Sequence, residues 1–163
     1  MEDHTRIYTK KWPRKNLGEL VNFLELQHPE GLSLRSLADD LDVTAQTVSR
    51  TFIRDDMKLS RAEEIAKAYG YELKLFYTEK EFLFEPINPV KRKNFPNAGN
   101  LAGLIKYIYD CNYSVAYVCT LANMNYNILM AALTNGDIFV SRLYEIVNAL
   151  KIEVLWIFDK IDN

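Results

Sequence analysis

Residues 33–50 read SLRSLADDLDVTAQTVSR, and this stretch decides the fold because two short helices and a tight turn can be placed on it. Ser33 is a favoured helix cap, and the apolar residues after it recur with the spacing of one helix face: Leu34, Leu37, Ala38 and Leu41. Asp42 and Val43 form a short turn. Thr44 then caps a second helix, whose apolar positions are Ala45, Val48 and Phe52.

Two further amphipathic helices are predicted on either side of this pair. The upstream helix has apolar residues at Leu17, Leu20, Val21 and Leu24 and ends before the segment His28-Pro-Glu-Gly31. The downstream helix starts at Ser60 and is stopped by Gly70. Its apolar positions are Ala62, Ile65, Ala66 and Tyr69.

The order of these helices, with Leu-x-x-Leu-Ala, a tight turn and a Thr-led helix, resembles the helix-turn-helix of the lambda-repressor-like (Xre/Cro-type) family. The resemblance covers about residues 16–77 and, more faintly, 100–158. It implies that residues 16–77 are a DNA-binding domain whose third helix lies in the major groove of double-stranded DNA.

The resemblance also implies which side chains contact DNA. Base reading is expected from the outward positions of the third helix: Gln46, Thr47, Ser49 and Arg50. Phosphate contacts are expected from residues at helix starts and edges: Arg35, Thr44, Arg54, Lys58, Ser60 and Arg61. The alternative is an ordinary solvated helix face.

An internal repeat divides the chain into two related halves. Residues 33–77 align with residues 114–158 at a constant shift of 81, with eight identities and a shared apolar pattern, and the upstream helices align at a shift of 84. We therefore predict a mainly α fold of two tandem lambda-repressor-like domains, 16–77 and 100–163, joined by a hairpin or linker over 78–99. The hairpin would pair residues 72–77 with 81–85, and residues 153–158 would form another strand or a last helical turn. Strand edges of this kind can pair across a two-fold axis to build a dimer.

The second copy has lost the DNA-reading chemistry of the first. The shift of 81 replaces Arg50 by Ala131 and Arg54 by Asn135, and the outer faces of both helices become apolar. An apolar outer face is usually covered by another surface, so we predict an association surface that includes Tyr117, Leu121, Ile128 and Met130. A second copy of the chain, giving a homodimer, is the favoured occupant. The first half and a different protein are the alternatives, and Asn125, Tyr126 and Asn127 retain a capacity for a few DNA contacts.

The charge distribution leaves one feature outside these domains. The chain has 163 residues and a net charge of −2, so its overall charge neither favours nor excludes DNA. Residues 1–15 form a basic N-terminal arm in which Tyr8 and Trp12 lie among the basic residues Arg6, Lys10, Lys11, Arg14 and Lys15. Such an arm can follow the DNA backbone or enter a minor groove; a solubilising tail is the alternative.

Other classes of function have little support in the sequence. No phosphate-binding glycine loop, metal-ligand spacing or nucleophile beside a histidine is present, so neither an enzyme nor a cofactor is expected. Cys111 and Cys119 are expected to be buried free thiols. Without a secretion signal or a membrane span, a cytoplasmic location is expected. The sequence favours a sequence-specific transcriptional regulator; a protein-binding adaptor or inhibitor on the same scaffold is the alternative.

Overall fold

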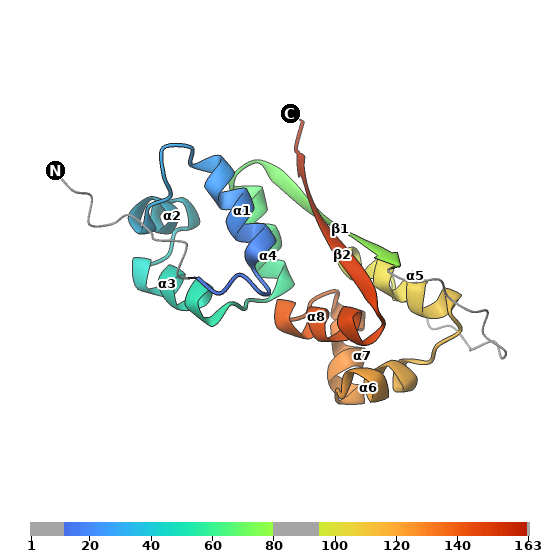
Figure 1. The fold of residues 1–163 in the computed structure, drawn as a ribbon. Coiled ribbons are helices and arrows are strands. Elements are labelled where there is room, and N and C mark those ends of the chain that lie inside the picture. The colour runs from blue at the N-terminus through green and yellow to red at the C-terminus, as the bar shows by residue number, and fades with distance from the viewer. Residues whose placement is uncertain (1–11, 80–94, 163) are drawn as a thin grey trace. The chain divides into compact units, whose positions relative to one another are not determined.

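The computed structural model describes residues 12–79 and 95–162. These residues form eight α-helices, one short 3₁₀ helix and one small antiparallel sheet of two strands (Figure 1). Their contacts divide the described chain into two compact units: the first unit is 12–73 with 158–162, and the second unit is 74–79 with 95–157. Most of the predicted arm, the second strand of the predicted hairpin and most of the linker lie outside the described residues.

Four helices build the first unit, in the places where the apolar spacing predicts them. They are α1 (Gly18–Gln27), α2 (Leu34–Leu41), α3 (Ala45–Arg54) and α4 (Leu59–Ala68). Ser33 caps α2 by accepting the Ser36 N–H at 2.9 Å, and Thr44 caps α3 by accepting the Thr47 N–H at 3.1 Å. The cap of α4 differs from the prediction, because the helix starts at Leu59, after Lys58, and the Lys58 side chain makes no capping hydrogen bond.

The core of the first unit is lined by leucines from α1, α2 and α4, including Leu20, Leu24, Leu37 and Leu59, none of which is measurably exposed. At one edge of the unit, the Tyr69 hydroxyl donates to Asp40 Oδ2 at 2.6 Å and lies 2.9 Å from His28 Nε2. Burial, followed by the neighbouring Asp40 carboxylate, raises the pKa of Tyr69 above its ordinary value. The Tyr69 hydroxyl therefore stays protonated and ties the ends of α1 and α4 to α2.

The structure corrects the predicted arm at its C-terminal end. Trp12 is buried, and its ring stacks on Phe52 of α3 with centroids 4.5 Å apart. The Arg14 guanidinium bonds to Glu25 at 2.7 Å and to Asn22 at 3.2 Å, both on α1. Trp12 and Arg14 are thus part of the folded first unit. Burial of the Trp12 ring in the core is favourable because it removes apolar surface from water.

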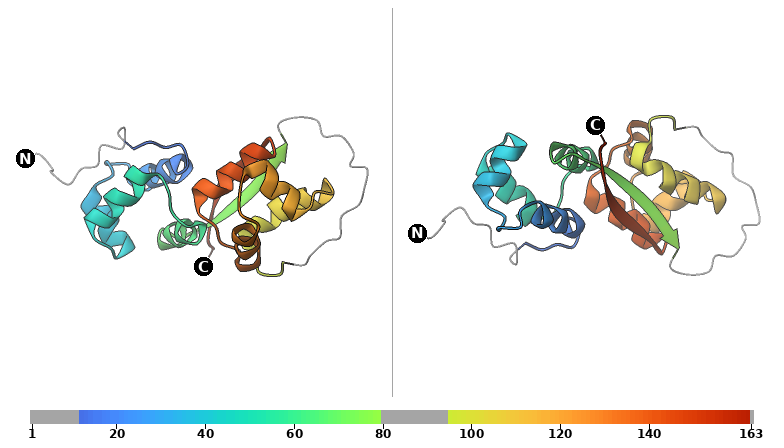
Figure 2. Two further views of the ribbon diagram at one scale, coloured as in Figure 1. Left: turned by 90° about the horizontal axis from the view of Figure 1, so that it is seen from below. Right: turned by 90° about the horizontal axis from the view of Figure 1, so that it is seen from above.

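The second unit also contains four helices in its described part. It contains the 3₁₀ turn η2 (Gly99–Leu101) and the helices α5 (Ala102–Asp110), α6 (Val115–Ala122), α7 (Tyr126–Asn135) and α8 (Val140–Ala149). Helices α6, α7 and α8 each begin and end 81 residues after α2, α3 and α4. Figure 2 shows two further views of these helices.

Equivalent residues also perform equivalent local tasks in the two units. Ser114 caps α6 as Ser33 caps α2, and Asn125 caps α7 as Thr44 caps α3. Where α3 is followed by Asp55, α7 is followed by Gly136, and both positions have positive φ. Glycine is required at 136 because a Cβ there would lie 2.1 Å from the Asn97 carbonyl oxygen.

The strands β1 (Tyr71–Glu79) and β2 (Ile152–Lys160) pair with each other, a pairing that the sequence did not predict. Residues 81–85, the second strand of the predicted hairpin, lie outside the described residues. Residues 153–158, for which the sequence allowed a strand or a last helical turn, form a strand. The Ile161 N–H donates to the Gly70 carbonyl at 2.9 Å just beyond the strands, so this antiparallel register places Leu75 opposite Trp156 and Phe76 opposite Leu155.

Candidate nucleic-acid interface

The turn between α2 and α3 sets the exposed face of α3. Asp42 adopts a left-handed conformation, and its N–H donates to the carbonyls of Ala38 and Asp39. This bond closes α2, and Thr44 opens α3 two residues later. Val48 and Phe52 point into the core and are 3% and 2% exposed. The opposite side of α3 therefore faces outward over its whole length.

The four predicted base-reading residues all lie on the accessible side of α3. Gln46, Thr47 and Arg50 are exposed, and Ser49 is half-buried. Gln46, Ser49 and Arg50 line one open depression together with Ile53 and Arg54. An amide, a hydroxyl and two guanidinium groups thus converge on a single patch of about two helical turns.

Thr47 is less available than its exposure indicates. Its backbone N–H is bound by the Thr44 hydroxyl, and the two threonine hydroxyl oxygens are 2.8 Å apart. The same bonds engage Thr44, which the sequence assigned to phosphate binding. Each hydroxyl keeps some remaining hydrogen-bonding capacity, but the primary task of this pair is to cap α3.

The remaining predicted phosphate contacts come from three places in the first unit. Arg35 on α2, Arg54 at the end of α3 and Lys58 before α4 are exposed, whereas Ser60 and Arg61 are half-buried. Arg61 also pairs with Glu64 at 3.0 Å. A phosphate would compete with this carboxylate for one edge of the guanidinium, so Arg61 is a weaker phosphate ligand than its type suggests.

Asp55 is a positioning residue that sequence reasoning missed. It follows α3 directly and is the one buried polar or charged residue of the described chain, at 6% exposure. Its carboxylate accepts the N–H groups of Asn16 at 2.8 Å and Leu17 at 2.9 Å, which satisfies donors ahead of α1. Asp55 therefore anchors the end of α3 to the start of α1. The sequence signal that could have indicated this role is an Asp, rather than the usual Gly, at the C-terminal end of α3.

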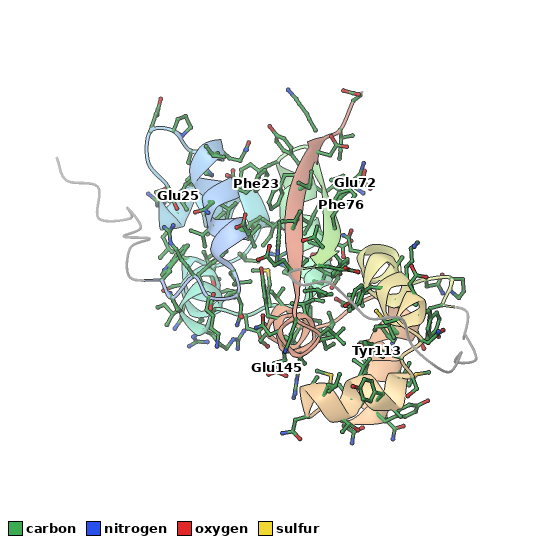
Figure 3. The ribbon with its side chains drawn as sticks, turned by 45° about the vertical axis from the view of Figure 1, so that its right-hand side comes forward. Phe23, Glu25, Glu72, Phe76, Tyr113 and Glu145 are labelled. Atoms are coloured by element: carbon green, nitrogen blue, oxygen red, sulfur yellow. The ribbon has the colours of Figure 1, made fainter. Side chains whose placement is uncertain are left out.

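The predicted association residues lie on the outer faces of α6 and α7. Tyr117, Leu121 and Ile128 are 46%, 41% and 48% exposed, whereas Met130 is half-buried. Tyr113, labelled in Figure 3, extends the face by packing against Tyr117 with ring centroids 5.0 Å apart. Tyr126 is also exposed and was not assigned to this surface. No charged residue occurs from Cys111 to Gly136, so the face is uncharged, and its exposed apolar side chains lie among polar ones such as Thr120 and Asn127.

The described residues also bear on metal ligation, membrane spanning and the two cysteines. Within 12–79 and 95–162, no group of three or more histidine, cysteine or acidic side chains could hold a metal ion. None of the described helices is both long and apolar enough to cross a membrane. Cys111 and Cys119 are buried free thiols, as predicted, and burial raises the pKa of both.

Comparison of the chain with protein-family models, with curated proteins and with solved structures finds no match in any of the three. Functional inference therefore depends on the chemistry of these surfaces.

Proposed function

We propose that the protein is a sequence-specific regulator of transcription that binds double-stranded DNA through α3 of the first unit. In this proposal both units are tandem copies of a lambda-repressor-like domain, and the second copy has lost its reading face. The observation that carries the proposal is the patch on α3, where Gln46, Ser49, Arg50 and Arg54 surround one depression on the solvent-facing side of the helix.

The chemistry of this patch suits the major groove. A glutamine amide can bond adenine at two atoms, and an arginine can do the same with guanine. Each such pair discriminates against a wrong base by about 1–3 kcal/mol. Arg35, Arg54 and Lys58 supply positive charge around the patch, which supports phosphate contacts that set the position of the protein without reading sequence.

The second unit is proposed to hold two copies of the chain together. A surface without charged residues meets no electrostatic repulsion when it packs against its own copy, and Tyr117, Leu121 and Ile128 are large enough to bury substantial apolar area. A homodimer would place two first units on half-sites roughly 34 Å apart. The same exposed residues would also suit the alternative occupant of this face, which is a protein of a different kind.

Selection of bound sequences from random double-stranded DNA at stated salt concentrations tests the proposal. We expect one enriched sequence with two inverted copies of a short motif. Enrichment of a single motif without inverted symmetry would retain DNA reading and remove the dimer. Failure of any sequence to enrich, with the protein folded, would favour the adaptor alternative.

A further inference from the structure

Ile53 is the exception on the outer face of α3, a helix that the structure describes completely. Its side chain is 60% exposed, although the other apolar side chains of comparable size on this helix, Val48 and Phe52, are in the core. Its outward neighbours are polar or charged: Gln46, Thr47, Ser49, Arg50 and Arg54. Ile53 is therefore a single exposed apolar side chain within a polar patch.

The position of Ile53 relates it to the proposed base-reading residues. It borders the same depression as Gln46 and Arg50, and it follows them by seven and three residues, which is the spacing of one helix face. With a rise of 1.5 Å per residue, Ile53 lies about 4.5 Å along the helix axis from Arg50. The rise of DNA is about 3.4 Å per base pair, so for a helix that lies along the major groove this offset corresponds to one or two base pairs.

The major groove offers an isoleucine one chemically suitable group. Base edges there present nitrogen and oxygen donors and acceptors, except for the C5-methyl group of thymine. An isoleucine side chain cannot replace the water bonded to a polar base edge, whereas burial against a methyl group removes apolar surface from water on both sides.

We propose that Ile53 contacts the C5-methyl group of a thymine one or two base pairs from the base read by Arg50. This inference rests on the proposed DNA-binding function and adds a specificity-determining residue to it. A sequence selected by the protein would then contain a thymine at this position in each half-site.

Replacement of thymine by deoxyuridine tests the inference, because deoxyuridine lacks only the methyl group. Affinity of the full chain is measured for the selected DNA and for versions with each thymine replaced in turn. We expect one replacement per half-site to weaken binding about fourfold, the effect of burying one methyl-sized group. Ile53→Ala should bind thymine and deoxyuridine versions equally. Leu26→Ala, which removes an even more exposed leucine on α1, should keep the wild-type preference.

The outcomes separate this inference from the proposed function. Specific binding without any preference for thymine over deoxyuridine would overturn the role of Ile53 and leave DNA reading in place. A preference that persists in Ile53→Ala would assign the methyl contact to another residue and also overturn it. Failure to bind any selected DNA specifically would instead remove the proposed function, and the inference with it.

Discussion

Phe158 stacks on Phe23 with ring centroids 4.1 Å apart and ring planes 7° apart, although the two residues come from opposite parts of the chain. Phe23, labelled in Figure 3, is buried on α1, and Tyr71 packs against its edge at 5.1 Å. The Ile161 N–H completes the contact by bonding to Gly70. Residues 158–161 are therefore structural parts of the unit that carries α3.

Phe158→Ala should destabilise the first unit. Loss of the half-buried Phe158 ring and of its stacking contact with Phe23 is expected to lower the unfolding free energy by about 1–3 kcal/mol. Trp12 is in the first unit and Trp156 in the second, so denaturation of variants in a Trp156→Phe background reports the first unit through Trp12 fluorescence. Ile157→Thr, a β-branched change at an exposed neighbouring position, should stay within about 0.5 kcal/mol of its parent. An unchanged midpoint for Phe158→Ala would remove residues 158–161 from the first unit.

Asp55→Ala should be more damaging than an ordinary surface change. It leaves the Asn16 and Leu17 N–H groups without the acceptor that now binds them, and each unsatisfied buried donor costs about 1–3 kcal/mol. Asp55→Asn keeps one acceptor oxygen and tolerates positive φ, so this variant should lose less unfolding free energy than Asp55→Ala. Asp39→Ala, at an exposed position on α2, is the matched control. Urea unfolding measures the decrease in unfolding free energy, which should be largest for Asp55→Ala, smaller for Asp55→Asn and smallest for the control. Equal decreases for Asp55→Ala and Asp39→Ala would contradict this role of Asp55.

Three substitutions on α3 separate base reading from phosphate contact. Gln46→Ala and Arg50→Ala should each weaken binding to the selected DNA by roughly 5- to 150-fold while hardly changing binding to random DNA. Arg54→Ala should weaken both alike and reduce the dependence of affinity on salt by about one phosphate contact. All three residues are exposed, so circular dichroism and the unfolding midpoint should be unchanged. Equal loss on both DNAs for Arg50→Ala would assign Arg50 to a phosphate.

The sequence predicted those parts of the fold that depend on local spacing. Helix periodicity and the Ser33 and Thr44 caps placed α2 and α3, and the shift of 81 transferred those bounds to α6 and α7. All four predicted base-reading residues lie on the accessible side of α3. These features follow from interactions within one or two helical turns.

Non-local contacts account for what sequence reasoning missed. The pairing of β1 with β2, which is far away in sequence, was not predicted, whereas the expected partner of residues 72–77 lies outside the described residues. Trp12 looked like an arm residue because nothing near it in sequence indicates a pocket beside Phe52. Asp55 received no predicted role, since its partners Asn16 and Leu17 precede it by 39 and 38 residues, with three helices between. Only tertiary packing distinguishes these residues from solvent-exposed ones.

Phe76, labelled in Figure 3, and Leu155 are exposed on the two strands, so the second unit has exposed apolar residues away from α6 and α7 as well. Phe76 lies opposite Leu155 in the strand register, and both side chains are about half exposed. A test of association through α6 and α7 must therefore distinguish that face from this one.

Leu121→Asp and Ile128→Asp should shift the proposed dimer toward monomer, because each places a charge on an apolar contact that has to be dehydrated. Sedimentation velocity over a range of protein concentrations measures the shift, which we expect to be at least tenfold in the dimer dissociation constant. Asn148→Asp, an exposed change on α8 that adds the same charge, should leave the constant unchanged. Phe76→Asp tests the competing face. A dimer that resists both α6 and α7 variants but dissociates in Phe76→Asp would move the interface to the strands. A monomeric wild-type chain would assign the α6 and α7 face to a different partner.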